Sequence, residues 1–116
     1  MRSRRQLTDR DRVLRSVPEK EFMAQIIEAA EWLGYRTYHV NDSRRDAPGF
    51  PDVWCVGRIG TPVEGRLVII ETKRETGQLT TDQALWLMDL ERLTRVDVRA
   101  ARPSQVDEIM ALLQAE

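Results

Sequence analysis

Residues 51–73, PDVWCVGRIGTPVEGRLVIIETK, are the stretch of sequence that decides the fold. It contains two short apolar runs, residues 53–56 and 67–70, on either side of a loop that holds Gly60 and Gly65. Two apolar runs rich in β-branched residues, separated by a glycine-containing loop, are typical of a β-hairpin. The sequence therefore predicts a hairpin, and its ends decide where the neighbouring charged residues lie.

The predicted hairpin brings two carboxylates together. Asp52 opens the first run, Glu71 closes the second, and the midpoint between them falls in the loop between Thr61 and Pro62. Symmetric pairing places Asp52 opposite Glu71, with Cβ atoms roughly 4.5–5.5 Å apart. Carboxylates this close repel each other unless a cation lies between them. Lys73 shares a strand face with Glu71, so the group suits a divalent cation beside a phosphate; charges at exposed strand ends are the structural alternative.

The segments around the hairpin predict an α/β fold. A helix is expected from the S-x-x-E capping pattern of Ser16 and Glu19 to Leu33, followed by Gly34 as its C-terminal cap. Further on we expect a strand at 35–40, a helix at 80–94 opened by the T-x-x-Q capping box of Thr80 and Gln83, a strand at 96–100 and a terminal helix from Pro103. The order αβββαβα predicts a four-stranded mixed sheet flanked by helices.

Composition and length predict one globular domain. The chain has 116 residues, 41% hydrophobic and 32% charged, and no apolar run approaches the ~20 residues of a membrane span. A single cysteine, Cys55, excludes an internal disulfide bond and a multi-cysteine zinc site. Because the basic N-terminus also lacks the apolar segment of a signal peptide, we expect an intracellular protein with no membrane partner.

The charge is unevenly distributed along the chain. Residues 1–15 carry six Arg and two Asp, a net charge of +4, so that the other residues together carry −5 within a total of −1. We expect this basic N-terminal tail to be either a solvated segment or an arm that grips phosphates.

Two further groups of polar residues have both a structural and a functional interpretation. Glu21 is either an acid favoured by the first turn of its helix or a third carboxylate that reaches the acid pair. In the polar loop 41–51, Ser43, Arg44 and Arg45 form either a solvated turn or a phosphate clamp beside Asp52.

Several motifs together resemble one nuclease family. The PD at 51–52 and the ETK at 71–73 match the degenerate signature of the PD-(D/E)xK nucleases. The wider match consists of Glu21-Phe22, YHVNDSRRDAPGFPD at 38–52, IIETKRETGQLTTDQALWL at 69–87 and RPSQVDEI at 102–109. These segments resemble the compact VRR-NUC branch, which is common in phage genomes. The resemblance covers roughly residues 19–110 and implies a restriction-endonuclease-like core, with residues 16–116 as the nuclease domain.

The resemblance also implies a role for each matching residue. Glu21, Asp52 and Glu71 are implied as metal ligands together with the backbone carbonyl of Thr72, and Lys73 as the catalytic lysine. Gln83 fills an additional glutamine position of the family; its capping role is the alternative. Members of this branch that stand alone look like dimeric Holliday-junction resolvases, so that a homodimer is implied, located in the host cytoplasm if a phage encodes it.

We therefore expect a DNA endonuclease that depends on Mg²⁺ or Mn²⁺, because oxygen-only ligands favour these ions over zinc. No motif for reading base sequence is evident, so branched or four-way junction DNA is the expected substrate class. The alternative is a nuclease-fold module that binds branched DNA or a partner nuclease without cutting it. A purely structural role is a third class, which predicts neither binding nor cleavage.

Overall fold

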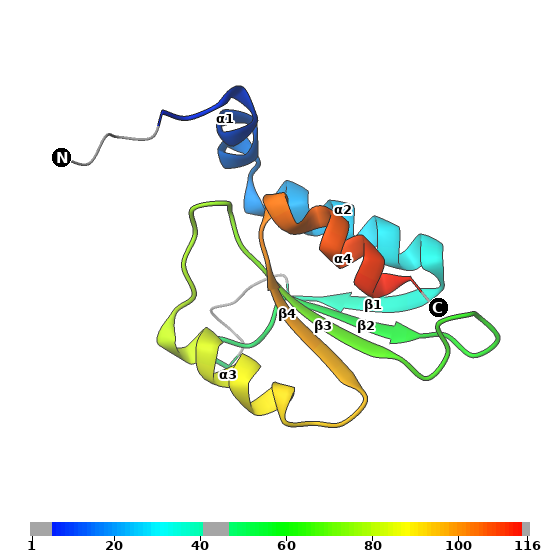
Figure 1. Ribbon diagram of the computed structural model, residues 1–116. Coiled ribbons are helices and arrows are strands. Elements are labelled where there is room, and N and C mark those ends of the chain that lie inside the picture. The colour runs from blue at the N-terminus through cyan, green and yellow to red at the C-terminus, as the bar shows by residue number, and fades with distance from the viewer. Residues whose placement is uncertain (1–5, 41–46, 115–116) are drawn as a thin grey trace.

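The structure is a computed structural model, and it describes residues 6–40 and 47–114. It consists of a four-stranded mixed sheet with helices on both faces (Figure 1). Its elements are α1 (Asp9–Ser16), α2 (Glu19–Leu33), β1 (Tyr35–His39), β2 (Val53–Gly57), β3 (Leu67–Thr72), α3 (Thr81–Glu91), β4 (Val96–Ala101), the 3-10 turn η1 (Pro103–Gln105) and α4 (Val106–Leu113). The predicted α/β class and four-stranded mixed sheet are confirmed. Among the described residues, none of the helices combines the length and the apolar character needed to cross a bilayer.

The sheet order follows the order of the sequence. β1 pairs antiparallel with β2, and β2 pairs antiparallel with β3, whereas β4 runs parallel to β3. A parallel neighbour needs a crossover connection, which here contains α3. The carboxyl ends of β3 and β4 therefore meet at one edge of the sheet, next to the start of β2.

The hairpin has the register that its symmetry predicts. Val53 pairs with Ile70 and Trp54 with Ile69, so one further step along both strands places Asp52 opposite Glu71. The backbone N–H of Asp52 donates a hydrogen bond of 3.2 Å to Oε2 of Glu71. The two carboxylates consequently lie on the same side of the sheet.

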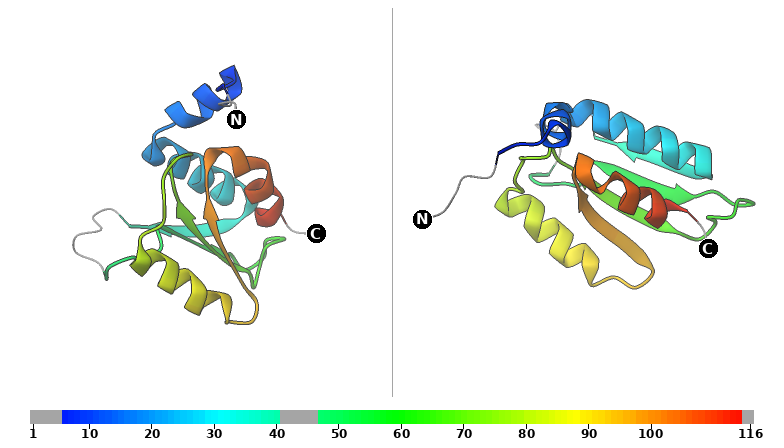
Figure 2. Two further views of the ribbon diagram at one scale, coloured as in Figure 1. Left: turned by 60° about the vertical axis from the view of Figure 1, so that its left-hand side comes forward. Right: turned by 45° about the horizontal axis from the view of Figure 1, so that its top comes forward.

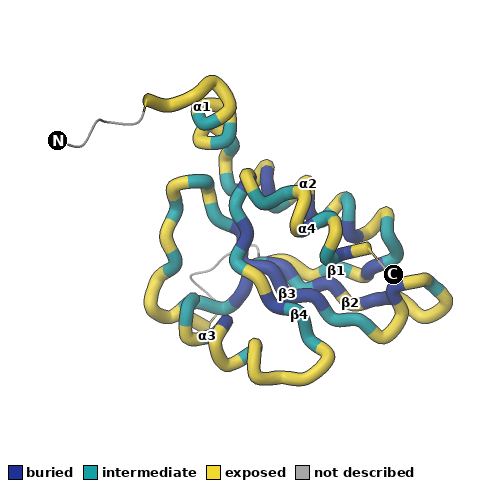
Figure 3. The backbone as a smooth tube through the Cα atoms, viewed as in Figure 1, coloured by how far each residue is buried: buried dark blue, intermediate teal, exposed yellow. Residues whose placement is uncertain are grey.

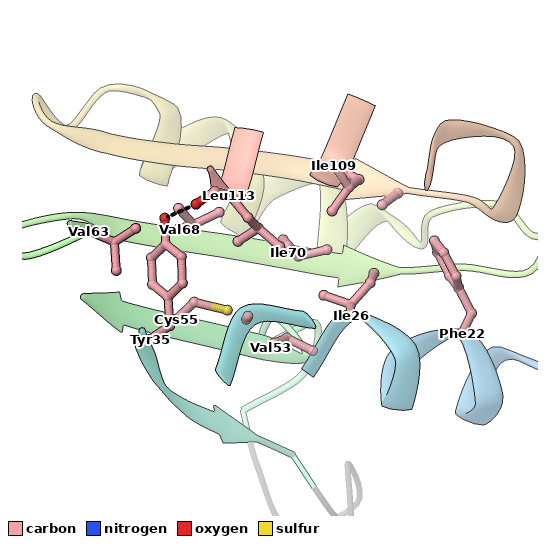
Figure 4. Packing of buried hydrophobic residues seen from close by; sticks show 12 residues of the cluster. Phe22, Ile26, Tyr35, Val53, Cys55, Val63, Val68, Ile70, Ile109 and Leu113 are labelled. Atoms are coloured by element: carbon pink, nitrogen blue, oxygen red, sulfur yellow. Dashed lines mark hydrogen bonds between the residues drawn. The ribbon is translucent and has the colours of Figure 1, made fainter. Parts of the chain in front are cut away.

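The two faces of the sheet are covered by different helices (Figure 2). α2 and α4 pack on the side chains that alternate with the acid pair, including Val53, Val68 and Ile70, and form the larger core. Figure 4 shows these side chains meeting between the sheet and the two helices. α3 covers the other face, where Leu87 packs against Ile69 and Val98 in a smaller core.

The N-terminal part of the chain corrects one prediction. Residues 9–16 form a separate helix, α1, with a capping box of Thr8 and Asp11, and it precedes the expected αβββαβα order. The predicted capping box of Ser16 and Glu19 is wrong. The N-cap of α2 is Pro18, which makes no side-chain hydrogen bond, and the Ser16 hydroxyl donates instead to the carbonyl of Val13 within α1.

Other helix ends agree more closely with the sequence. Gly34 ends α2 with a φ of 111°, a left-handed conformation that glycine adopts without steric cost. The capping box of Thr80 and Gln83 is present at the start of α3. That helix ends at Glu91, three residues before the expected Thr94, and the terminal segment begins with η1 before α4.

A hydrogen bond through the larger core ties β1 to the last turn of α4. The hydroxyl of Tyr35, which is fully buried, donates to the carbonyl oxygen of Leu113 at 2.8 Å (Figure 4). The same carbonyl accepts from the guanidinium of Arg66 at 3.2 Å. It therefore keeps a partner when the tyrosine hydroxyl is removed.

We predict that Tyr35→Phe lowers the free energy of unfolding by about 1 kcal/mol, the usual net contribution of one buried hydrogen bond. Urea denaturation followed by circular dichroism measures it. The matched control is Tyr38→Phe on the same strand, because Tyr38 is 61% exposed; there we expect a change below about 0.5 kcal/mol. Equal effects in the two variants would show that the buried bond contributes nothing.

Candidate functional site

The site is built around Asp52 and Glu71, which we call the acid pair. Asp52 is half-buried just before β2, and Glu71 lies in β3 with 1% of its surface exposed. A carboxylate this deeply buried in a central strand is rare unless it is paired or hydrogen-bonded. Glu71 therefore needs a specific explanation.

Each carboxylate of the acid pair is held by hydrogen bonds that fix its direction. Oε2 of Glu71 accepts from the backbone N–H of Asp52, and Oε1 accepts from the side-chain amide of Gln83 at 3.0 Å. Oδ2 of Asp52 accepts from the backbone N–H of Thr72 at 3.0 Å and from its hydroxyl at 2.9 Å. The pair is thus oriented by donors from β3 and α3 before any ligand arrives.

Burial and the neighbouring charge change the protonation of Glu71. Desolvation is the main cause that raises the pKa of Glu71 from 4.5 to about 8, and the charge of Asp52 adds to it, whereas Lys73 acts in the opposite direction. At neutral pH the glutamate therefore holds a proton in the metal-free protein. A cation bound between the two carboxylates would remove this penalty and favour the ionised form.

A second acid of α2, besides the predicted Glu21, interacts electrostatically with Asp52. Glu19, in the first turn of α2, is half-buried, and its pKa is raised first by burial and then by the charge of Asp52. Lys73 and Arg74 lower that pKa, so Glu19 lies in the same electrostatic environment as the acid pair. Glu21 is exposed. Two residues along a helix turn by about 200°, so Glu19 and Glu21 point to different sides of α2.

The sequence did contain a signal for Glu19. It precedes an apolar stripe in the same way as Glu21, and we assigned it to a capping box that the structure does not form. The predicted role of Glu21 stays a prediction, and Glu19 becomes the better placed candidate.

The loop before Asp52 is fixed against α3 by a close backbone approach. A Cβ at Gly49, where φ is +78°, would come within 2.4 Å of the carbonyl carbon of Asp82 and 2.5 Å of the nitrogen of Gln83. Only glycine allows this contact. It brings the segment that carries Asp52 next to the helix turn that carries Gln83.

Three aromatic rings secure the same junction. The ring of Phe50 stacks on that of Trp54 and meets the ring of Trp86 edge-on. The ring centroids are 5.2 Å apart in both pairs. The indole N–H of Trp54 donates to the carbonyl of Pro51, and that of Trp86 donates to the carbonyl of Pro48. These contacts hold the loop before β2 against α3, next to the acid pair.

The donor set fits a hard divalent cation in part. The acid pair offers two adjacent carboxylates, and oxygen ligands of this kind suit Mg²⁺ or Mn²⁺. Thr72, whose carbonyl was predicted as a further ligand, is buried next to the pair. Within residues 6–40 and 47–114, however, no three His, Cys, Asp or Glu side chains lie close enough together to hold a metal ion.

The remaining predicted residues divide into two groups. Lys73 directly follows β3, is half-buried and acts electrostatically on both Glu71 and Glu19. Gln83 performs its capping role and also donates to Glu71, and its place at the family's glutamine position stays a prediction. The phosphate clamp proposed for Ser43, Arg44 and Arg45 lies outside the described residues.

A groove beside the site is lined in part by Glu19. It has a volume of about 1300 Å³ and runs along α2 and β1, with Glu19, Trp32 and His39 among its lining residues. The acid pair does not line it.

The chain was also compared with known proteins. None of the protein families, curated proteins or solved structures searched gives a significant match to it.

We predict that the metal-free protein loses stability as the pH rises. Between pH 4.5 and about 8 the folded state binds more protons than the unfolded chain, because the pKa of Glu71 is raised on folding. The free energy of unfolding therefore falls across this range. Mn²⁺ should raise the melting temperature more at pH 8.5 than at pH 5, which differential scanning fluorimetry with and without EDTA measures.

Glu71→Gln is the control for this prediction, because it keeps the shape of the side chain and removes its titration. This variant should show a smaller pH dependence and little response to Mn²⁺. Equal Mn²⁺ shifts at both pH values, or an unchanged response in the variant, would contradict the assignment.

Proposed function

We propose that the protein is a metal-dependent endonuclease that hydrolyses phosphodiester bonds of branched DNA. The observation that carries the proposal is the buried acid pair, oriented by hydrogen bonds and followed on the same strand by Lys73. A purely structural role gives no reason to bury Glu71 beside the half-buried Asp52, because burying a charge costs free energy. A phosphodiester hydrolase needs this group to hold a cation against the scissile phosphate.

The resemblance to the VRR-NUC branch of the PD-(D/E)xK nucleases supports this assignment. The motif residues Asp52, Glu71 and Lys73 stand at the start of β2 and the end of β3. We include the restriction-endonuclease-like core and the homodimer in the proposal. The homodimer would supply two active sites, as two symmetric cuts in a four-way junction require.

The proposed chemistry divides between the cation and the side chains. Mg²⁺ or Mn²⁺, when bound, supplies Lewis-acid polarisation of the phosphate and lowers the pKa of water. Asp52 and Glu71 would hold it, and Glu71 gives up its proton when it does so. Lys73 offers a compact positive charge to the negative charge that develops on the phosphate oxygens in the transition state.

Gln83 and Thr72 act as positioning residues. The amide of Gln83 donates to one oxygen of Glu71, and the N–H and hydroxyl of Thr72 donate to one oxygen of Asp52. In each carboxylate, the other lone pairs stay available for a cation. Fixed carboxylates of this kind reduce the reorganisation needed at the moment of reaction.

One observation favours a second candidate, a module that binds branched DNA or a partner nuclease without cutting. The described residues contain no three-ligand metal cluster, and a binding module needs none. Nicked, forked and four-way DNA incubated with Mn²⁺ and with EDTA separates the two functions. Products that form only with metal support the nuclease, whereas band shifts without products in either condition support the module.

We predict that Lys73→Ala lowers the cleavage rate with Mn²⁺ by at least about 100-fold, the usual cost of losing one group that stabilises transition-state charge. The fold should be retained, as circular dichroism checks. Lys20→Ala is the matched control, because Lys20 is the second of the two lysines and is exposed. Full activity in Lys73→Ala would remove this residue from the mechanism.

We further predict that Glu19→Gln weakens cleavage more than Glu21→Gln does. Glu19 interacts with Asp52 and Lys73, whereas Glu21 is exposed. Loss of a ligand or of a group that supports one typically costs about 10–100-fold in metal affinity or activity. Titrating Mn²⁺ in cleavage assays should give a raised half-saturating concentration for Glu19→Gln alone. The reverse order would restore the prediction made for Glu21.

A further inference from the structure

The N-terminal helix α1 contributes no side chain to the two hydrophobic cores. None of its residues is buried (Figure 3). Figures 1 and 2 show it projecting from the body of sheet and helices, beyond the start of α2. An isolated helix of 8 residues is unstable in water. A well-capped helix that buries no side chain suggests a function outside the core.

The base of α1 is attached to the catalytic segment. Nη2 of Arg74 donates a hydrogen bond of 3.0 Å to the backbone carbonyl of Arg15. Arg74 directly follows Lys73, and Glu19, only three residues beyond Ser16, shares the electrostatic environment of the acid pair. The C-terminal end of α1 therefore lies at the edge of the candidate active site.

The charges of α1 are arranged along its length. Its two acids lie in the first turn, where Asp11 completes the capping box and Asp9 contacts Arg12 at 3.1 Å. Arg12 and Arg15 are three positions apart and therefore share one face of the helix. Both are exposed. The ion pair of Arg12 with Asp9 is exposed and therefore contributes little to stability, so that Arg12 can exchange it for a phosphate contact.

We propose that α1 is a DNA-binding arm that places Arg12 and Arg15 on the sugar-phosphate backbone next to the cleavage site. The proposal rests on the nuclease function and adds to it a binding surface outside the metal site. Charge complementarity selects the occupant. α1 itself carries three Arg and two Asp, a net charge of +1, and the segment 1–15 that contains it carries +4 against −5 in the rest of the chain. Phosphate contacts of this kind supply affinity and register without base specificity.

The geometry limits how far the arm reaches. Four residues of helix separate Arg12 from Ser16, about 6 Å. The three extended residues from Ser16 to Glu19 add at most about 11 Å. Phosphates repeat every ~3.4 Å along one strand. Arg12 thus contacts DNA within roughly five nucleotides of the cut, with the length of its side chain in addition.

The test measures binding in EDTA, so that no cleavage occurs, with a fluorescent four-way junction between 50 and 200 mM salt. Removing two phosphate contacts in Arg12→Ala/Arg15→Ala should reduce the slope of log K against log salt by about 1.8. Alanine favours helix, and the Arg74 bond is made to a backbone carbonyl, so α1 itself is retained. The melting temperature should change little, because the side chains of Arg12 and Arg15 are exposed.

The matched control is Arg58→Ala/Arg92→Ala, which removes the same charge from exposed positions at the far ends of β2 and α3. The slope of the control should equal that of the wild type. A series of junctions with arms shortened from 12 to 4 base pairs should lose the difference between wild type and arm variant at the shortest length.

An unchanged slope in the arm variant would overturn the proposal, and so would an equal change of slope in the control. If the unchanged slope comes with a lower molar mass of the arm variant in light scattering, α1 belongs to a contact between two copies of the chain. Mn²⁺ cleavage assays run in parallel separate this test from the proposed function. If the slope changes as expected but no products form, the nuclease function is rejected and the DNA-binding role of α1 is retained. If products form but the slope is unchanged, the nuclease function is retained and the DNA-binding role of α1 is rejected.

Discussion

The structure depends on one unfavourable contact, that of the buried Glu71 with the half-buried Asp52 beside it. Glu71 is almost inaccessible to solvent, and the charge of Asp52 adds to the cost of ionising it. The fold tolerates this because a hairpin of fixed register, a backbone N–H and the amide of Gln83 hold the acids in place. Energy stored at a braced site of this kind is usually connected with function.

The rest of the architecture can be understood as support for this contact. Gly49 lets the loop before Asp52 lie against the first turn of α3, and the rings of Phe50, Trp54 and Trp86 fix it there. The parallel return of β4 leaves the ends of β3 and β4 at the same edge, where Lys73 N–H donates to the carbonyl of Ala101. The sheet topology thus fixes the position of Lys73, the catalytic lysine of the proposal.

Local sequence signals predicted the parts of the fold that local physics controls. Hairpin symmetry predicted the Asp52–Glu71 opposition, and the capping box at Thr80 predicted the start of α3. Tertiary contacts decided the rest. Ser16 lies in a helix that sequence periodicity did not reveal, so its pattern with Glu19 was misassigned, and Glu19 was missed as a neighbour of Asp52. Neither the approach of Gly49 to α3 nor the bond from Arg74 to Arg15 has a local signature.

The central claim is that the acid pair is arranged to hold a divalent cation. The most direct measurement is anomalous X-ray scattering from a crystal of the protein soaked in Mn²⁺ at pH 8. The account predicts a manganese peak in contact with a carboxylate oxygen of both Asp52 and Glu71. No peak at this position, while Glu71 keeps its bonds to Asp52 and Gln83, would contradict it.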